Sequence, residues 1–232
     1  MNEEPDRETA LIEMLAAGVA HEVRNPLNSV QINLTIIERE LSELLPDHEA
    51  HVFVVLRKIA GEIKRLDDFV SEFLRFARPP RLNVERLPVR SLLSDLAAFL
   101  APECSKKGVE LSLELTGPET AFVDGFQLKQ AVLNLVLNAL QATATKGRVV
   151  IRTRGDDPRG FVLAVCDDGE GMPPEIKEKV FTPFFTTREG GTGLGLPLVR
   201  RIVEQHGGSV EISSALGEGT TVTLVLPAAP GG

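Results

Sequence analysis

The sequence predicts an α-helical hairpin followed by a two-layer α/β sandwich. In the first 80 residues, apolar side chains recur at alternating spacings of four and three, typical of supercoiled helices packed side by side. After Arg78-Pro79-Pro80-Arg81, glycines become frequent and β-branched runs alternate with helical segments. The 232 residues are 43% hydrophobic and 25% charged, enough apolar material for a sizeable core. We therefore expect a helical domain over residues 1–78, a linker over 79–86 and a second domain over 87–232.

The composition also excludes some function classes. Asp and Glu number 33 against 25 Lys and Arg, and this net charge of −8 disfavours nucleic-acid binding, as does the absence of Trp and Tyr. The N-terminus MNEEPDRETA has no apolar signal region, and no apolar run is long enough to span a membrane. Cys104 and Cys166 lie in apolar stretches, as buried free thiols do. We expect a cytoplasmic chain without nucleic-acid or membrane contact, unless it is a piece of a larger membrane protein.

Two apolar stripes define the expected hairpin. The first comprises Val23, Leu27, Val30, Leu34, Ile37, Leu41 and Leu44. The second comprises Val52, Leu56, Ile59, Ile63, Leu66, Val70, Phe73 and Ala77. Pro46-Asp47 marks the turn between them. Two helices cannot enclose a core, so we expect a second copy to complete a four-helix bundle across a two-fold axis. The alternative is that the hairpin packs on the second half of its own chain.

The second domain is predicted to alternate strands and helices. Helical segments are expected at 90–100, 126–144 and 194–206, the last ending at Gly207-Gly208. Strands rich in Val, Ile, Leu and Thr are expected at 109–115, 148–153, 161–166, 209–213 and 220–226. The stretch from Met172 to Gly191 is long and without a regular pattern, which is typical of a mobile lid.

The first candidate for chemistry is His21 in His21-Glu22-Val23-Arg24-Asn25-Pro26-Leu27. The heptad places His21 just off the apolar stripe, facing solvent beside a carboxylate that can accept its ring proton. Pro26 removes a backbone donor within the helix, a defect that costs about 3 kcal/mol and calls for a reason. A merely solvated surface histidine is the alternative.

Polar amides and glycine-rich turns form the second group of candidates. Asn134 and Asn138 lie one helical turn apart and could offer oxygen ligands to Mg²⁺ or merely cap neighbouring loops. Asp167-Asp168-Gly169-Glu170-Gly171 follows a strand, where a carboxylate could accept from an exocyclic amine and glycines admit a flat ligand. Gly191-Thr192-Gly193-Leu194-Gly195 opens a helix, as anion sites do. The spacing is that of neither the Rossmann motif nor the P-loop.

Taken in this order and spacing, the motifs resemble the histidine kinases of two-component signalling over nearly the whole chain. The boxes of that family match here as His21–Leu27 (H), Asn134–Ala142 (N), Asp167–Gly171 (G1), Phe181–Phe185 (F) and Gly191–Leu196 (G2). Gly217-Glu-Gly-Thr220 matches a further glycine turn. The residues of the H and N boxes are most similar to those of the nitrogen-regulation-type subgroup. The resemblance implies a dimerising phosphoacceptor hairpin followed by an ATP-binding domain of the Bergerat type.

For the phosphoacceptor hairpin, the resemblance implies three roles. His21 would accept the γ-phosphoryl group of ATP and pass it to an Asp of a response regulator receiver domain. Glu22 would take the proton of His21. Asn25 would orient water for dephosphorylation of the regulator.

For the nucleotide site, the resemblance implies one role for each motif. Asn138 would bind Mg²⁺ with Asn134 on the phosphate side, and Asp167, with Gly169 and Gly171, would read the adenine. The remaining residues would anchor the lid or cradle phosphates, namely Phe184, Phe185, Arg188, Gly191, Thr192, Gly193, Leu194 and Gly195. The basic residue that often follows an N box is replaced by Gln141 and Thr143.

Two other classes share parts of this pattern. A Bergerat-fold ATPase of the chaperone or mismatch-repair type would have the nucleotide boxes but not the helix carrying His21. A dimeric binding protein with a degenerate nucleotide site would not keep Asn138, Asp167 and the glycines of 191–195 intact.

Overall fold

The computed structural model describes residues 27–28, 30–37, 39, 41, 50–77, 81–155, 160–188 and 191–228. The chain divides into two compact units, residues 1–80 and 81–232. Each unit is described by itself below. The predicted turn at Pro46-Asp47 lies outside the described residues.

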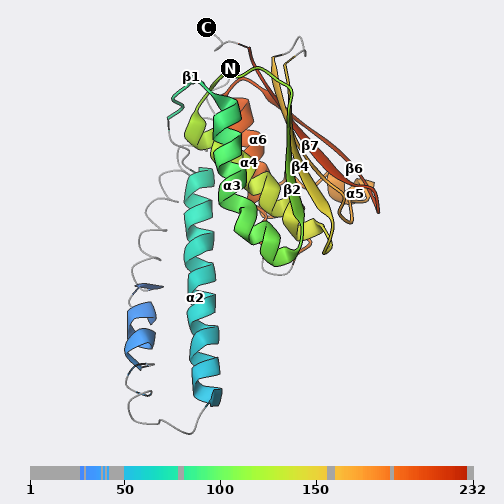
Figure 1. Ribbon diagram of the computed structural model, residues 1–232. Helices are drawn as coiled ribbons and strands as arrows, with labels where there is room; N and C mark the ends of the chain where they lie inside the picture. Colours follow the sequence, from blue (N-terminus) through green and yellow to red (C-terminus); the bar gives the residue numbers. More distant parts are fainter. Residues whose placement is uncertain are drawn as a thin grey trace. The chain divides into compact units, whose positions relative to one another are not determined.

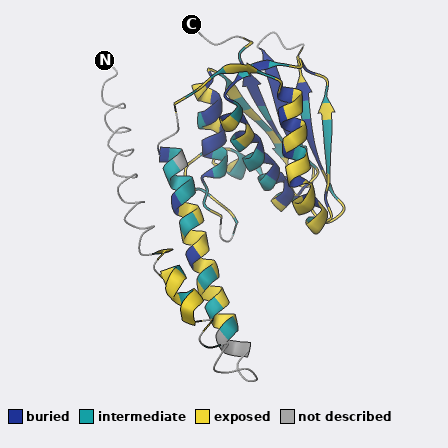
Figure 2. Ribbon diagram, turned by 60° about the vertical axis from the view of Figure 1, so that its left-hand side comes forward, coloured by how far each residue is buried: buried dark blue, intermediate teal, exposed yellow. Residues whose placement is uncertain are grey.

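The first unit is helical. Helix α2 spans Ala50–Ala77, and the described residues between 27 and 41 are also helical. This earlier helical segment runs alongside α2 in both views (Figures 1 and 2). The two segments match the predicted pair of helices.

Among the described residues of each predicted apolar stripe, the two heptad positions differ in exposure. One heptad position of α2 is half-buried or buried, namely Leu56, Ile63, Val70 and Ala77. At the other heptad position Ile59 and Leu66 are 41% and 50% exposed, whereas Phe73 is half-buried. The earlier segment repeats this division, because Leu27, Leu34 and Leu41 are half-buried whereas Val30 and Ile37 are 44% and 43% exposed. Apolar side chains at regular heptad spacing therefore remain on the surface of the single chain.

The second unit is a two-layer sandwich, which confirms the predicted fold class. Its main sheet has five strands in the order β2-β4-β5-β7-β6, in which β2 and β4 are parallel and the other neighbours antiparallel. These strands are β2 Glu110–Leu115, β4 Arg148–Arg154, β5 Phe161–Asp167, β6 Ser209–Ala215 and β7 Gly219–Leu226. Three helices cover one face of the sheet, namely α3 Val89–Lys107, α4 Gly125–Ala142 and α6 Gly195–Gln205 (Figure 1). Between these two layers lie the fully buried side chains of Leu93, Leu128, Ile151, Leu163, Leu198 and Leu224.

Three short elements were not predicted. Strand β1 (Glu85–Leu87) pairs antiparallel with β3 (Ala121–Val123), and α5 is a single turn at Pro174–Lys177. The predicted linker 79–86 therefore contains two residues of a strand of the second unit. Helix α3 also continues past Pro102, because the buried stripe extends through Leu100 to Cys104.

Asp124 fixes the start of α4. Its Oδ1 accepts from the N–H groups of Phe126 and Gln127, both at 3.0 Å, and its Oδ2 accepts from Asn83 N at 2.9 Å. Its own N–H donates to Nε2 of buried His206 at 2.9 Å. One residue thus ties together the entry to the second unit, the N-terminus of α4 and the C-terminus of α6.

Candidate functional site

The predicted site residues fall into two sets. His21, Glu22 and Asn25 lie outside the described residues. The others lie in the second unit, on α4, at the end of β5 and in the segment from 169 to 195. The candidate site described here is therefore that of the second unit.

Asp167 ends β5 with a half-buried carboxylate. Its Oδ1 accepts from Gly169 N at 3.0 Å and from Thr220 N at 3.1 Å. In the described part of the chain, no donor reaches Oδ2. Burial raises the pKa of Asp167, whereas the hydrogen bonds from Gly169 and Thr220 lower it. The side chain is thus oriented through one oxygen, and the other can accept from a ligand.

The turn between β6 and β7 supports the carboxylate of Asp167, a role that was not predicted from the sequence. Ser214 Oγ accepts from Met172 N at 2.9 Å and donates to the Gly219 carbonyl at 3.0 Å. Gly217 N donates to the Glu170 carbonyl at 2.7 Å. These bonds join the turn to the loop after β5, so that Thr220 N is aimed at Asp167.

Arg188 contacts Asn138 of helix α4, although 50 residues separate the two in the sequence. Arg188 Nη1 donates to Asn138 Oδ1 at 3.1 Å and to Gln141 Oε1 at 2.7 Å. Its Nη2 donates to the Asn138 carbonyl at 3.2 Å. The guanidinium charge also lowers the pKa of Asp167, although this contribution is smaller than the opposing effect of burial. Arg188 therefore brings positive charge to the helix turn where Gln141 stands in place of a basic residue.

The glycines of the motifs allow backbone segments of the second unit to approach one another closely. A Cβ at Gly169 would lie 2.6 Å from the Ala142 carbonyl oxygen, and one at Gly171 would lie 1.9 Å from that of Ala215. Gly193, with φ of +68°, would place a Cβ 2.4 Å from the carbonyl carbon of Phe184. We expected Gly169 and Gly171 to make room for a flat ligand, whereas here their space is bounded by backbone of the same unit.

The segment before α6 is held at several points. Phe184 N donates to the Gly193 carbonyl at 3.0 Å, while the Phe184 side chain is 53% exposed, so this residue contributes a backbone bond rather than a buried ring. Thr192 Oγ1 accepts from Leu194 N at 3.3 Å, and the Leu194 side chain is fully buried. Arg200 of α6 stacks over the Phe181 ring at 5.4 Å. Helix α6 begins at Gly195, one residue later than predicted, and Gly191 is exposed just ahead of it.

The described residues fit a phosphate group with a bound divalent cation. The buried Asn134 Nδ2 has no hydrogen-bond partner in the described part of the chain, so it can donate to a ligand oxygen. Asn138 offers an amide oxygen, and Mg²⁺ is commonly held by few protein groups together with phosphates and water. The described residues contain no cluster of three or more His, Cys, Asp or Glu side chains for a metal.

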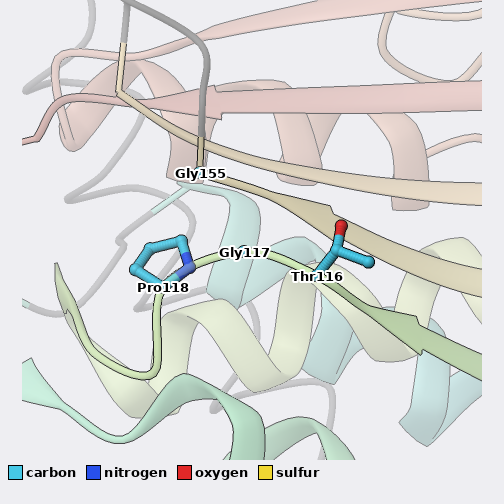
Figure 3. A pocket seen from close by; sticks show the side chains of 4 residues that line it. All are labelled: Thr116, Gly117, Pro118 and Gly155. Carbon is cyan, nitrogen blue, oxygen red and sulfur yellow. The ribbon is translucent and has the colours of Figure 1, made fainter.

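A separate hollow lies at the other end of the sheet. Thr116, Gly117, Pro118 and Gly155 line a cavity of about 520 Å³ where β2 and β4 end (Figure 3). Asp167 pairs with Val149 at the opposite end of β4. The hollow is therefore distinct from the candidate site, and none of its lining side chains is charged.

Comparison with known proteins identifies the family. Residues 12–81 match the family of the His Kinase A (phospho-acceptor) domain. Residues 123–230 match the family described as histidine kinase-, DNA gyrase B-, and HSP90-like ATPase. The chain belongs to the two-component sensor histidine kinases. The match over 12–81 argues against the chaperone and mismatch-repair classes, which do not account for the predicted phosphoacceptor helix.

Curated histidine kinases align with almost the whole chain. Sensor histidine kinase ZraS of Escherichia coli (strain K12) is 36% identical over 98% of this chain and 48% of its own length. Sporulation kinase C of Bacillus subtilis (strain 168) is 34% identical over 92% of this chain and 48% of its own length. The chain thus spans about half the length of these relatives.

Solved histidine kinase structures share the fold. ShkA, solved at full length in complex with AMPPNP, superposes with a TM-score of 0.76 at 27% identity, covering 94% of this chain and 47% of its own. ThkA in complex with response regulator protein TrrA superposes with a TM-score of 0.70 at 26% identity, covering 98% and 65%. Among the described residues, no helix has the length and apolar character needed to cross a membrane.

Proposed function

We propose that this chain is an ATP-dependent protein histidine kinase that phosphorylates His21 and transfers the phosphoryl group to an Asp of a response regulator. We also propose that it dephosphorylates that regulator with the help of Asn25. Residues 1–78 would form the dimerising phosphoacceptor domain, 79–86 the linker and 87–232 the ATP-binding domain. Its assignment to the nitrogen-regulation-type subgroup stays a prediction.

The observation that carries the proposal is the pairing of two recognition groups on one unit. Asp167 presents an oriented carboxylate with Oδ2 open to an exocyclic amine. Asn138 and Arg188 bring an amide oxygen and a cation together on α4, as binding of a phosphate chain with its metal requires. The loop after Asp167 contacts the end of the same helix, because Glu170 N donates to the Ala142 carbonyl at 3.2 Å.

The chemistry of the proposal is a phosphoryl transfer governed by position and charge. A ring nitrogen of His21 bonds to the γ-phosphorus as the bond from that phosphorus to the bridging oxygen breaks, and ADP leaves. Glu22 takes the proton of the imidazole. Arg188 stabilises negative charge on the phosphates, Asn138 holds Mg²⁺, and Asp167 orients the adenine. Bound Mg²⁺ would neutralise phosphate charge.

A homodimer belongs to the same proposal. Ile59 and Leu66 remain 41% and 50% exposed at one heptad position of α2, and Val30 and Ile37 repeat this on the earlier segment. A second copy would bury these side chains in a four-helix bundle, which is the usual partner of such a stripe. The phosphoacceptor match over residues 12–81 supports this partner.

The receiver partner and the location follow from the proposed reaction. ThkA is recorded in complex with response regulator protein TrrA, and its structure covers 98% of this chain. A receiver domain is therefore the partner that we propose. ATP and such a receiver would meet the chain in the cytoplasm, where we place it.

Incubation with γ-labelled ATP tests the proposal directly. We expect a label that stays on the protein, is lost in acid and survives base, because phosphohistidine has this stability. The matched control is His21→Gln, which should remain unlabelled. Release of phosphate without protein label would favour an ATPase of the chaperone or mismatch-repair type. Neither label nor release, despite nucleotide binding, would favour a binding protein.

A further inference from the structure

Arg188 is held by neutral groups only. Its guanidinium donates to the side-chain oxygens of Asn138 and Gln141 and to the Asn138 backbone carbonyl. No carboxylate of the described residues forms an ion pair with it. Neutral acceptors orient a guanidinium without cancelling its charge, so this cation keeps its full attraction for an anion.

The three acceptors of Arg188 are not equally available to it once a nucleotide binds. Asn138 has a single side-chain oxygen, and under the proposed function that oxygen serves Mg²⁺. A divalent cation and a guanidinium repel each other at one oxygen atom. Gln141 lies one helical turn beyond Asn138, and its distance of 2.7 Å is the shortest of the three. It is therefore the side-chain acceptor that stays available to Arg188.

The geometry points to Gln141 as a positioning residue that holds Arg188 at the phosphate end of the nucleotide site. This inference rests on the proposed function and goes beyond it, since Gln141 is not among the residues expected to contact the nucleotide. Gln141 supplies no charge of its own. It fixes the direction from which a cation of the segment before α6 reaches the phosphates, as preorganised electrostatic sites require.

Calorimetric titration of the full chain with Mg²⁺–AMPPNP and with adenosine tests the inference. Gln141→Ala should weaken Mg²⁺–AMPPNP binding by about three- to tenfold, the worth of one hydrogen bond, and leave adenosine binding unchanged. Gln141→Glu should weaken Mg²⁺–AMPPNP binding further, because a carboxylate would pair with Arg188 and cancel its charge. The matched control is Gln205→Ala, an exposed glutamine at the end of α6, which should change neither affinity.

A double-mutant cycle separates positioning from a general structural effect. If Gln141 acts through Arg188, Gln141→Ala should have no further effect in an Arg188→Ala background. Gln141→Lys should restore part of the affinity lost in Arg188→Ala, because it places a cation on the same helix turn. Additive losses in the double variant, or an equal loss for adenosine, would overturn the inference. Failure of the unsubstituted chain to bind AMPPNP would instead refute the proposed function.

Discussion

Substitution of Asp167 by Asn separates recognition of the nucleotide from support of the fold. Both backbone donors to this residue, Gly169 N and Thr220 N, bond to Oδ1. An asparagine keeps that oxygen and orients its amide by the same two donors. Only the second oxygen is replaced, by an NH₂ group that cannot accept from an exocyclic amine.

The expected loss follows from that single replacement. A hydrogen bond to a charged group is worth about 1.5–3 kcal/mol, so ATP affinity should fall roughly ten- to a hundredfold. Asp167→Ala should lose similar affinity and also destabilise the second unit, because two backbone donors in a partly buried position would lose their acceptor. Calorimetric titration gives the affinities, and thermal unfolding of the same samples gives the stabilities.

The pH dependence of Asp167→Asn has a definite sign. Burial raises the pKa of Asp167 above its ordinary value of 3.8. The contribution of Asp167 to stability is therefore complete below pH 3.8. It declines as the pH rises through the raised pKa of the folded state, because the folded chain must then ionise a half-buried carboxyl. The asparagine has no charge to bury, so the variant should be at least as stable as the natural chain at neutral pH. Its melting temperature should also depend less on pH.

Two results would refute this account of Asp167. One is equal binding of ATP and GTP by the unsubstituted chain, since GTP has no exocyclic amine at the same place on its base. The other is a large loss of stability at neutral pH in Asp167→Asn, which would mean that the second oxygen supports the fold.

Three further predictions concern the helical unit. His21→Gln should abolish labelling from γ-labelled ATP while nucleotide affinity stays within a few-fold, and a labelled variant would move the phosphoacceptor to another histidine. Residues 1–80 should sediment as a helical dimer at micromolar concentration, and Ile59→Lys with Leu66→Lys should sediment as a monomer, because both side chains are exposed in the single chain. Asn25→Ala should lose most dephosphorylation of a phosphorylated regulator and keep much of the autokinase activity. A parallel fall of both activities with melting temperature would reduce Asn25 to a helix-adjusting role.

The main sheet could be predicted from sequence because its signals are local. Each of its five strands is a short run rich in Val, Ile, Leu or Thr that ends at a turn, and each lies within two residues of its predicted bounds. Strands β1 and β3 have three residues each, and their pairing joins Leu87 to Ala121. No local pattern shows such a pairing. Helix α3 runs seven residues beyond its predicted end at Leu100, because its buried face continues to Cys104 despite Pro102.

The candidate site was predictable as residue types but not as contacts. The motifs singled out Asn138 and Asp167, and the family resemblance added Arg188. The bond from Arg188 to Gln141 spans 47 residues, and that from Thr220 to Asp167 spans 53. Such contacts depend on how the elements pack, so the supporting roles of Gln141 and Thr220 became visible only in the structure.

The turn between β6 and β7 offers a matched pair of glycines that tests whether this packing sets the site. Gly217 and Gly219 have φ of +79° and +82°, so an alanine at either position meets similar backbone strain, about 1 kcal/mol. A Cβ at Gly217 would meet nothing within 4 Å, whereas one at Gly219 would lie 2.0 Å from the Asp167 carbonyl oxygen.

Gly217→Ala should therefore lower the melting temperature slightly and keep ATP affinity. Gly219→Ala must push the turn away from β5, which removes Thr220 N from Asp167 Oδ1 and frees the carboxylate to rotate. It should lose both stability and ATP affinity, measured by thermal unfolding and titration of the two variants side by side. Equal behaviour of the two variants would mean that strain in the turn, rather than its contact with Asp167, decides the outcome. The glycine turn would then have no part in holding the carboxylate of Asp167, which we propose reads the adenine.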